Sequence, residues 1–499
     1  MFLKPACWHW GLSYLLIFVL AGIFSSCATP DRYTLSSIQA DYAGAASVED
    51  DVWAGVFEIN GTGLKSPEST NAPMTIRDVL FITLKNNPDL NQARTRIQEA
   101  AAMTDIVKAA FWPSLGFYTE YMQGDAPSSY LFKKIDQRKL PQEADFNEPG
   151  WFENYESGLH ARMNLFNGGK DYLAVQMAKK GEMIADLDRQ ALENLLITRV
   201  ITSFYDALAA GEFVKIAEKS VQTISEHLRM MQVRLEGGGA LKSDVLSLEV
   251  RLARAKEQLL SSKNHYEIAL ASLFNLMGLD SGFINDDTEA LEKSFLDTPL
   301  LPETFTDGFV HALKHRPEIA SIRRKLIQLR MEVDSAKSSY LPSLDLMMKY
   351  YVADPEMKYD LDRENWIAAV ILNWDFFSGF ATQASVRRAE SALKEMLAAD
   401  QKQLLKIRLD VKTAYLNRQE AESRYEVAGK AVESAEESFR IVKNHYLGGS
   451  VPVTRFLEAE LDLNKARIHV AVAYYDREKA SAEIARTVGL WSSQAIFPK

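Results

Sequence analysis

The 499-residue chain is poor in cysteine and has no basic block, and each absence excludes a class of protein. Its two cysteines, Cys7 and Cys27, cannot form a disulfide scaffold or a cysteine-rich zinc site. Lysine and arginine total 57 against 67 aspartate and glutamate residues, a net charge of −10 that argues against a nucleic-acid partner. No nucleophile–base–acid set stands out among the 8 histidines, so we predict no catalytic residue, metal or cofactor.

Residues 1–26 resemble the signal peptide of a bacterial lipoprotein. The apolar run from Trp8 to Phe24 is short for a membrane-spanning helix and ends in small residues before Cys27. This pattern predicts cleavage before Cys27 and its acylation, for example by palmitate, which would anchor the protein in lipid. Phe24 stands where this motif usually has leucine, so a plain signal cleaved near Ala28 is the alternative.

An internal repeat organises the rest of the chain. Residues 111–115 (FWPSL) match 340–344 (YLPSL) at an offset of 229, whereas 166–168 (FNG) match 377–379 (FSG) at an offset of 211. The first copy therefore carries an insertion of 18 residues between positions 116 and 165. The expected parts are a signal over 1–26, an extended arm over 27–73, a first repeat over 74–279, a linker over 280–302, a second repeat over 303–490 and a tail over 491–499.

Each repeat is predicted to hold short helices, a β-hairpin and a long helical hairpin. The β-hairpins are expected at about 114–166 and 343–377, where apolar and polar residues alternate, as from Leu159 to Leu165 or from Val370 to Phe376. Such strands fit a sheet with one wet face or a transmembrane barrel. Four strands cannot close in lipid, two chains give a filled barrel of eight, and three chains give twelve strands with a lumen.

The helical hairpins are expected at about 170–278 and 380–488. No proline occurs from Gly150 to Thr298, and the thirteen positions that step by three and four from 404 to 446 are apolar except Arg418. This period predicts a coiled coil, and a helix over 170–236 would be about 100 Å long. A tube of that length could cross a bacterial periplasm, which favours a conduit.

The order of these motifs, repeated twice, resembles the TolC-like outer membrane efflux protein family. The motifs are Asn87 to Leu90, the two Pro-Ser-Leu strand starts, Leu165 to Gly169 and the two glycine turns, and the resemblance covers about 74–490. It implies a mixed α+β membrane protein: a trimeric 12-stranded outer-membrane β-barrel with four strands per chain, continued by a long α-helical coiled-coil barrel.

The resemblance also implies a function and partners. The chain would be a passive exit channel rather than an enzyme, in a tripartite efflux or type I secretion system. Its partners would be two further copies, a periplasmic adaptor, an inner-membrane transporter and outer-membrane lipid. Drug, metal and protein export all remain open as its task. The alternative from another class is a lipid-anchored periplasmic coiled-coil scaffold without transport, but a scaffold needs no amphipathic strands.

In this family the hairpin tips meet the adaptor, and a periplasmic gate follows the second turn. Turn geometry alone would also explain the glycines there, because glycine readily adopts left-handed backbone conformations. The family's acidic gate positions match Arg455 and Glu458, and Arg455 departs from the acidic pattern. We therefore predict a gate latch in which Arg455 pairs with Glu458 or Asp244 between hairpins, the alternative being solvated surface charge. The predicted adaptor-contacting residues are Leu235, Gly237, Gly238, Gly239, Asp244, Tyr446, Gly448, Gly449 and Ser450.

Four further patterns carry less weight. His311 and His315 have the spacing of a zinc-binding pair but lack the glutamate of a metalloprotease, so we predict an ordinary surface helix. The glycine-rich segment 237–243 is not a phosphate loop, because a coiled coil rather than a strand precedes it. The long connection 124–152 is expected to be an external or adhesive feature. Aromatic residues of the second hairpin fit an interfacial belt or plain strand packing: Tyr350, Trp366 and Trp374.

Overall fold

The structure is a computed structural model of the chain, which divides into residues 1–71 and 72–499. It describes residues 73–143, 145, 147–279, 291–296, 300–358 and 361–497, all in the second unit. The predicted signal, Cys27 and the arm lie outside the described residues, as does much of the predicted linker. Among the helices described, none combines the length and the apolar character needed to cross a bilayer.

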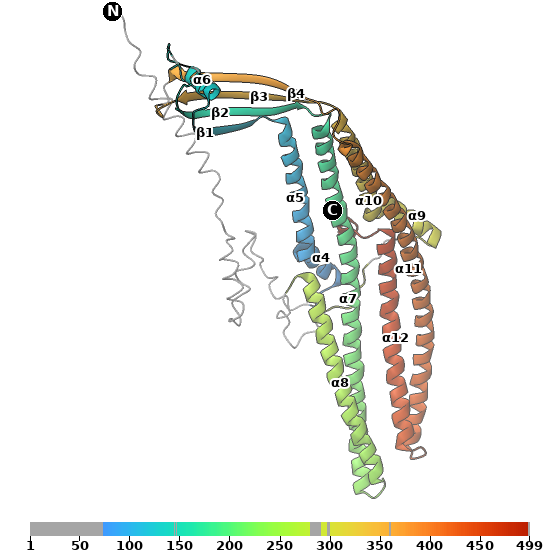
Figure 1. The fold of residues 1–499 in the computed structure, drawn as a ribbon. Coiled ribbons are helices and arrows are strands. Elements are labelled where there is room, and N and C mark those ends of the chain that lie inside the picture. The colour runs from blue at the N-terminus through green and yellow to red at the C-terminus, as the bar shows by residue number, and fades with distance from the viewer. Residues whose placement is uncertain are drawn as a thin grey trace, which may run out of the picture. The chain divides into compact units, whose positions relative to one another are not determined.

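Apart from α6 (Pro127–Asp136), each α-helix of the first repeat has a counterpart of equal length in the second (Figure 1). The pairs have 11, 21, 67 and 36 residues. The duplication read from sequence is therefore a duplication of structure. The pairs are α4 (Ile76–Asn86) and α9 (Phe305–His315), α5 (Pro88–Lys108) and α10 (Pro317–Lys337), α7 (Lys170–Glu236) and α11 (Ala381–Leu447), and α8 (Lys242–Met277) and α12 (Val453–Val488).

Local chemistry sets where these helices begin and end. Asn87 accepts hydrogen bonds from the backbone N–H groups of Asp89 and Leu90, and Pro88 takes the first position of α5, where a missing N–H costs nothing. The helix α8 ends at Gly278, whose φ of +71° is a left-handed conformation that favours glycine. A Cβ at Gly278 would also lie 2.9 Å from the Asn86 carbonyl oxygen, so only glycine fits there.

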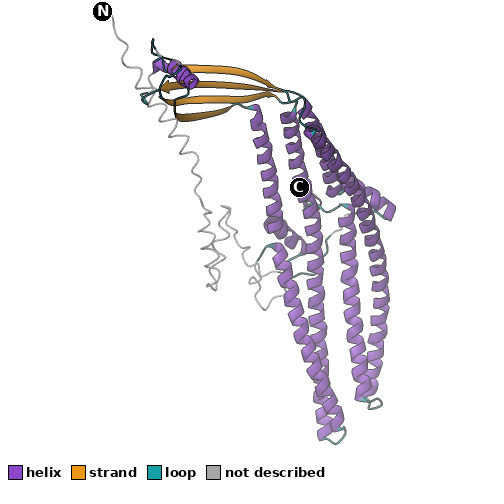
Figure 2. Cartoon of the chain, viewed as in Figure 1, coloured by secondary structure: helices purple, strands orange, loops and turns teal. Residues whose placement is uncertain are grey.

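The four strands form one antiparallel sheet in the order β1-β2-β3-β4, and the pairing of β2 with β3 joins the two repeats (Figure 2). The expectation that the last strand runs on through Trp374 and Phe376 is wrong. Asn373 pairs with Ser343, the first residue of β3, and Pro342 before it offers no N–H, so the ladder ends there. The strands are β1 (Ser114–Gly124), β2 (Phe152–Phe166), β3 (Ser343–Asp354) and β4 (Glu364–Asn373).

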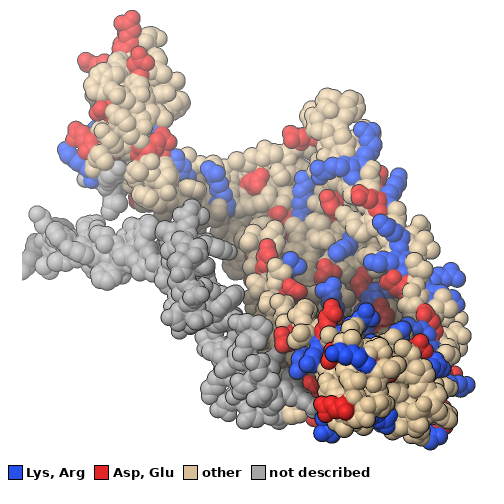
Figure 3. All heavy atoms as spheres, turned by 90° about the horizontal axis from the view of Figure 1, so that it is seen from below, with Lys and Arg blue, Asp and Glu red and all other residues tan. Residues whose placement is uncertain are grey.

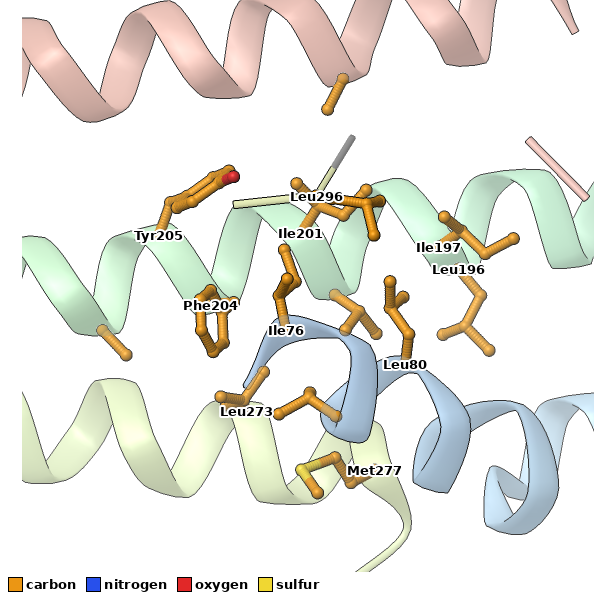
Figure 4. Close-up of a cluster of buried hydrophobic side chains, with 14 of the residues drawn as sticks. Ile76, Leu80, Leu196, Ile197, Ile201, Phe204, Tyr205, Leu273, Met277 and Leu296 are labelled. Carbon is orange, nitrogen blue, oxygen red and sulfur yellow. The ribbon is translucent and has the colours of Figure 1, made fainter. Parts of the chain in front are cut away.

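The helices pack around α7, which contacts α5, α8, α10 and α12, while α11 packs on α10 and α12. The largest buried cluster lies where α4 crosses the α7–α8 pair (Figure 4). Ile76 and Leu80 of α4 are fully buried there against α7 and α8. The ring of Tyr205 on α7 lies 6.0 Å from that of Tyr475 on α12, so the cluster also joins the two repeats. The predicted helical hairpins are thus tied to each other as well as folded on themselves.

Candidate functional site

The sheet has one apolar and one polar face. Residues paired across the sheet share a face, and the line from Leu115 through Ala161 and Met348 to Ala368 marks the apolar one. Its side chains are exposed in the single chain: Trp366 is 74% and Val370 63% exposed. The described chain therefore presents a broad apolar surface, which marks contact with lipid or another protein.

The polar face carries charged and aromatic side chains instead. The register line from Tyr118 through Gly158 and Tyr351 to Asn365 lies on it, as do Glu156, His160 and Lys349. In the described part of the chain, β1 pairs only with β2 and β4 only with β3, so both outer edges offer unpaired backbone groups. A sheet with an apolar face and two open edges is incomplete by itself.

The glycine turns at the other end of the molecule have matching geometry. Gly238 and Gly449 adopt φ of +75° and +74°. The N–H of Gly239 donates to the Arg234 carbonyl at 2.8 Å, and the N–H of Ser450 donates to the His445 carbonyl at 2.9 Å. These bonds close each long helix in the same way and satisfy its last carbonyls. The two turns also touch, because the Arg234 guanidinium donates to the Leu447 carbonyl at 3.1 Å.

The structure separates the predicted adaptor-contacting residues into surface and core. Gly237, Gly238, Gly239, Gly448, Gly449 and Ser450 are exposed, and Leu235 and Asp244 are half-buried. Tyr446 is buried, with its ring stacked 4.8 Å from that of Phe456, so its side chain supports the tip rather than facing a partner. Sequence reasoning missed three exposed apolar side chains beside the first turn, Val233, Leu241 and Leu246. Their positions off the coiled-coil seam were the available signal.

Of the two pairings predicted for the gate latch, the structure contains the one between Arg455 and Glu458. Arg455 Nη1 lies 3.2 Å from Glu458 Oε2, but both residues belong to α12 and both side chains are more than half exposed. Among the ion pairs of the described residues, none joins Arg455 to Asp244. A solvated pair on one helix contributes about 0–1 kcal/mol and holds no hairpins together.

A different ion pair bridges the two hairpins further along α12 from the glycine turn. Glu460 on α12 is only 3% exposed and accepts hydrogen bonds from Arg251 Nη2 on α8 at 2.8 Å and Ser220 Oγ on α7 at 2.6 Å. Asn464 donates to the same carboxylate. This Arg251–Glu460 pair was invisible in the sequence, because its members lie 209 positions apart in different repeats.

Seen from the tip end, Figure 3 shows acidic and basic side chains interspersed along the helices.

His227 of α7 is buried between the hairpins. It is 3% exposed, and its ring lies 4.2 Å from that of Phe456 on α12 and 5.7 Å from that of Tyr446 on α11. Burial lowers the pKa of His227 below its ordinary 6.5, Lys443 lowers it further, and Glu226 opposes them. The closed packing therefore holds a neutral imidazole.

We expect acid to loosen the tips through His227. Below about pH 6.5, His227 is protonated when the hairpins are separated but stays neutral when they are packed, because its pKa is lower in the packed state. Packing of the hairpins therefore loses stability as the pH falls from about 6.5 to that lowered pKa. The protection factors of the tip amides, which correct for the intrinsic slowing of hydrogen exchange in acid, should fall between pH 7.5 and 5.5 in the wild type and change little in His227→Leu. His265→Leu, which alters an exposed histidine of α8, should keep the wild-type response. Equal responses in all three proteins would rule His227 out.

The histidine pair identified in the sequence makes ordinary structural contacts. The rings of His311 and His315 stack with centroids 3.9 Å apart, and the Nδ1 atoms lie 2.9 Å from the Val488 carbonyl and 3.0 Å from the His311 carbonyl. Within the described ranges, no group of three or more His, Cys, Asp and Glu side chains is placed to hold a metal ion. His311 thus ties α9 to α12, and His315 contacts its own helix.

Comparison with known proteins decides between the remaining classes. The family described as outer membrane efflux protein matches residues 80–279 and 309–490. The chain belongs to this family. The alkaline protease secretion protein AprF of Pseudomonas aeruginosa is 25% identical over 323 residues, which cover 64% of each chain. The proteases secretion protein PrtF of Dickeya chrysanthemi is 22% identical and covers 85% of this chain and 90% of its own.

A solved structure agrees with this assignment. The CmeC outer membrane channel of Campylobacter jejuni superposes with a TM-score of 0.71 at 19% identity, over 83% of this chain and 85% of its own. As an outer membrane efflux protein, the chain is an exit channel of the outer membrane. The long hairpins form its periplasmic part.

Proposed function

We propose that three copies of this chain form one conduit, closed as a barrel of twelve strands and continued by a tube of helical hairpins. The supporting observation is the sheet of four strands, apolar on one face and unpaired at both edges. In lipid such edges must pair, and pairing β1 of one copy with β4 of the next satisfies them all. Three copies leave a lumen lined by the polar face.

The conduit would take its substrates from a periplasmic adaptor and an inner-membrane transporter. We propose that the adaptor binds the glycine turns together with the exposed Val233, Leu241 and Leu246, because exposed apolar groups at a tip mark a protein contact. Acyl chains on Cys27 would add an anchor in the outer membrane. Two relatives are named for protease secretion, which supports type I secretion as one use.

Purified protein should therefore behave as a trimer that conducts ions. Native mass spectrometry should give three chains per particle, and a planar bilayer should show discrete, uniform current steps. Protein that inserts and folds yet shows neither property would favour the lipid-anchored scaffold. Trimers without current would keep the assembly and indicate that the tips are shut, which variants at the Arg251–Glu460 pair can test.

A further inference from the structure

The connection between β1 and β2 is more than the loop expected from sequence, because it contains a helix. It has 27 residues, 125–151, against the nine residues 355–363 that join β3 to β4, a difference equal to the 18-residue insertion. Within it, α6 (Pro127–Asp136) lies at the end of the sheet away from the long helices (Figure 1). That end faces outward when the hairpins are periplasmic.

An ionic cluster fixes α6 to the polar face of the sheet. Glu156 of β2 is 1% exposed, and its two carboxylate oxygens accept from Lys133 of α6 at 2.7 Å and from Lys349 of β3 at 2.6 Å. The Tyr118 hydroxyl of β1 donates to the same carboxylate at 2.7 Å. A carboxylate this buried needs all its partners, so α6 cannot lift away without exposing or unpairing charge.

Contacts at both ends of α6 lock it in the same place. Tyr130 is buried with its ring edge-on to Phe152, 6.4 Å between centroids. At the other end, Tyr351 Oη donates to the Asp136 carboxylate at 3.2 Å and Asn365 Nδ2 donates to the Asp136 carbonyl at 3.2 Å. The helix is therefore tied to β2, β3 and β4 rather than to its own hairpin alone.

These contacts place α6 on the face that lines the lumen in the proposed trimer, on which this inference rests. We propose that α6, present three times, is a fixed size-selecting constriction at the outer mouth of the channel. Its free side presents Phe132, 65% exposed, and Ile135, 41% exposed, toward the passage. The second repeat lacks such a helix among its described residues, so the constriction has three elements and not six.

The expected substrates follow from this shape. Three apolar-sided helices fixed over the polar face leave a narrow, partly apolar passage. It passes small amphipathic solutes or an unfolded polypeptide and holds back folded proteins. The selection acts at the exit, independently of any gate at the hairpin tips.

Polymer exclusion in planar bilayers tests this proposal on the whole protein. Polyethylene glycols that enter a mouth lower the conductance, so graded sizes added to one chamber give the width of the mouth facing that chamber. In one variant, residues 125–151 are replaced by the sequence of 355–363, which joins the equivalent strands. We expect its cut-off on the loop side to shift to larger polymers, with the cut-off on the hairpin side unchanged.

A point variant guards against misfolding of the deletion. Glu156→Gln leaves Lys133 and Lys349 without their anion and should shift the loop-side cut-off in the same direction. Glu120→Gln is its matched control, since Glu120 lies directly opposite Glu156 in the register but is exposed. If the wild type and all variants formed conducting trimers with the same polymer cut-off on the loop side, the proposed constriction would be refuted. Absence of current in every protein, wild type included, would instead count against the proposed channel.

Discussion

Glu460→Gln should open the periplasmic end of the channel. The carboxylate is buried between α7, α8 and α12, and the substitution leaves the guanidinium of Arg251, whose side chain is only 20% exposed, without its counter-charge. Breaking a buried pair in this way costs about 3–5 kcal/mol. If opening separates the hairpins, the closed–open equilibrium shifts by at least roughly two powers of ten. Single-channel recordings should show longer and more frequent openings.

Two controls separate this latch from the gate expected in the sequence. Glu458→Gln alters an exposed carboxylate two positions away, whose pair with Arg455 is worth about 0–1 kcal/mol, and should leave the openings unchanged. The double change Arg251→Met with Glu460→Leu replaces the charges by apolar groups and should restore the closed state. If Glu458→Gln changed the openings and Glu460→Gln did not, the gate would lie at Arg455 and Glu458, as the sequence predicts, and not at the Arg251–Glu460 pair.

Val370→Arg should block assembly in the outer membrane, whereas Ile371→Arg should not. These neighbours lie in the same strand, but Val370 is on the apolar face and Ile371 on the polar face. Arginine facing lipid near the middle of a barrel strand costs about 2–4 kcal/mol, and a trimer suffers it three times. Membrane fractionation and heat-resistant trimers on gels measure the difference. Equal yields from both variants would refute the assignment of the two faces.

Much of the fold follows from local pattern and could be predicted. The steps of three and four that place Ile407, Val411 and Ala414 on one side of a helix also bury them in the structure. Glycine at positions 238 and 449 predicts a reversal of chain direction, because the backbone there adopts a positive φ that favours glycine. The duplication makes each such signal appear twice, which is why α7 and α11 are both found with their turns.

Other features depend on pairs of residues that sequence spacing does not relate. The contact between Arg251 and Glu460 depends on how the two hairpins pack against each other, and the sequence pattern within either hairpin does not predict that packing. Ordinary single-helix pairs, such as Arg455 with Glu458, are what spacing alone can foresee.

Local patterns were enough to predict the class of protein, with its two repeats, amphipathic strands, coiled-coil hairpins and turns, because each of these elements arises from contacts between residues near in the chain. The charges that bridge the hairpins, and the face of the sheet on which α6 lies, became known from the three-dimensional packing. Those outcomes depend on long-range packing, where a carboxylate such as Glu156 is buried only because lysines from α6 and β3 arrive together to satisfy it.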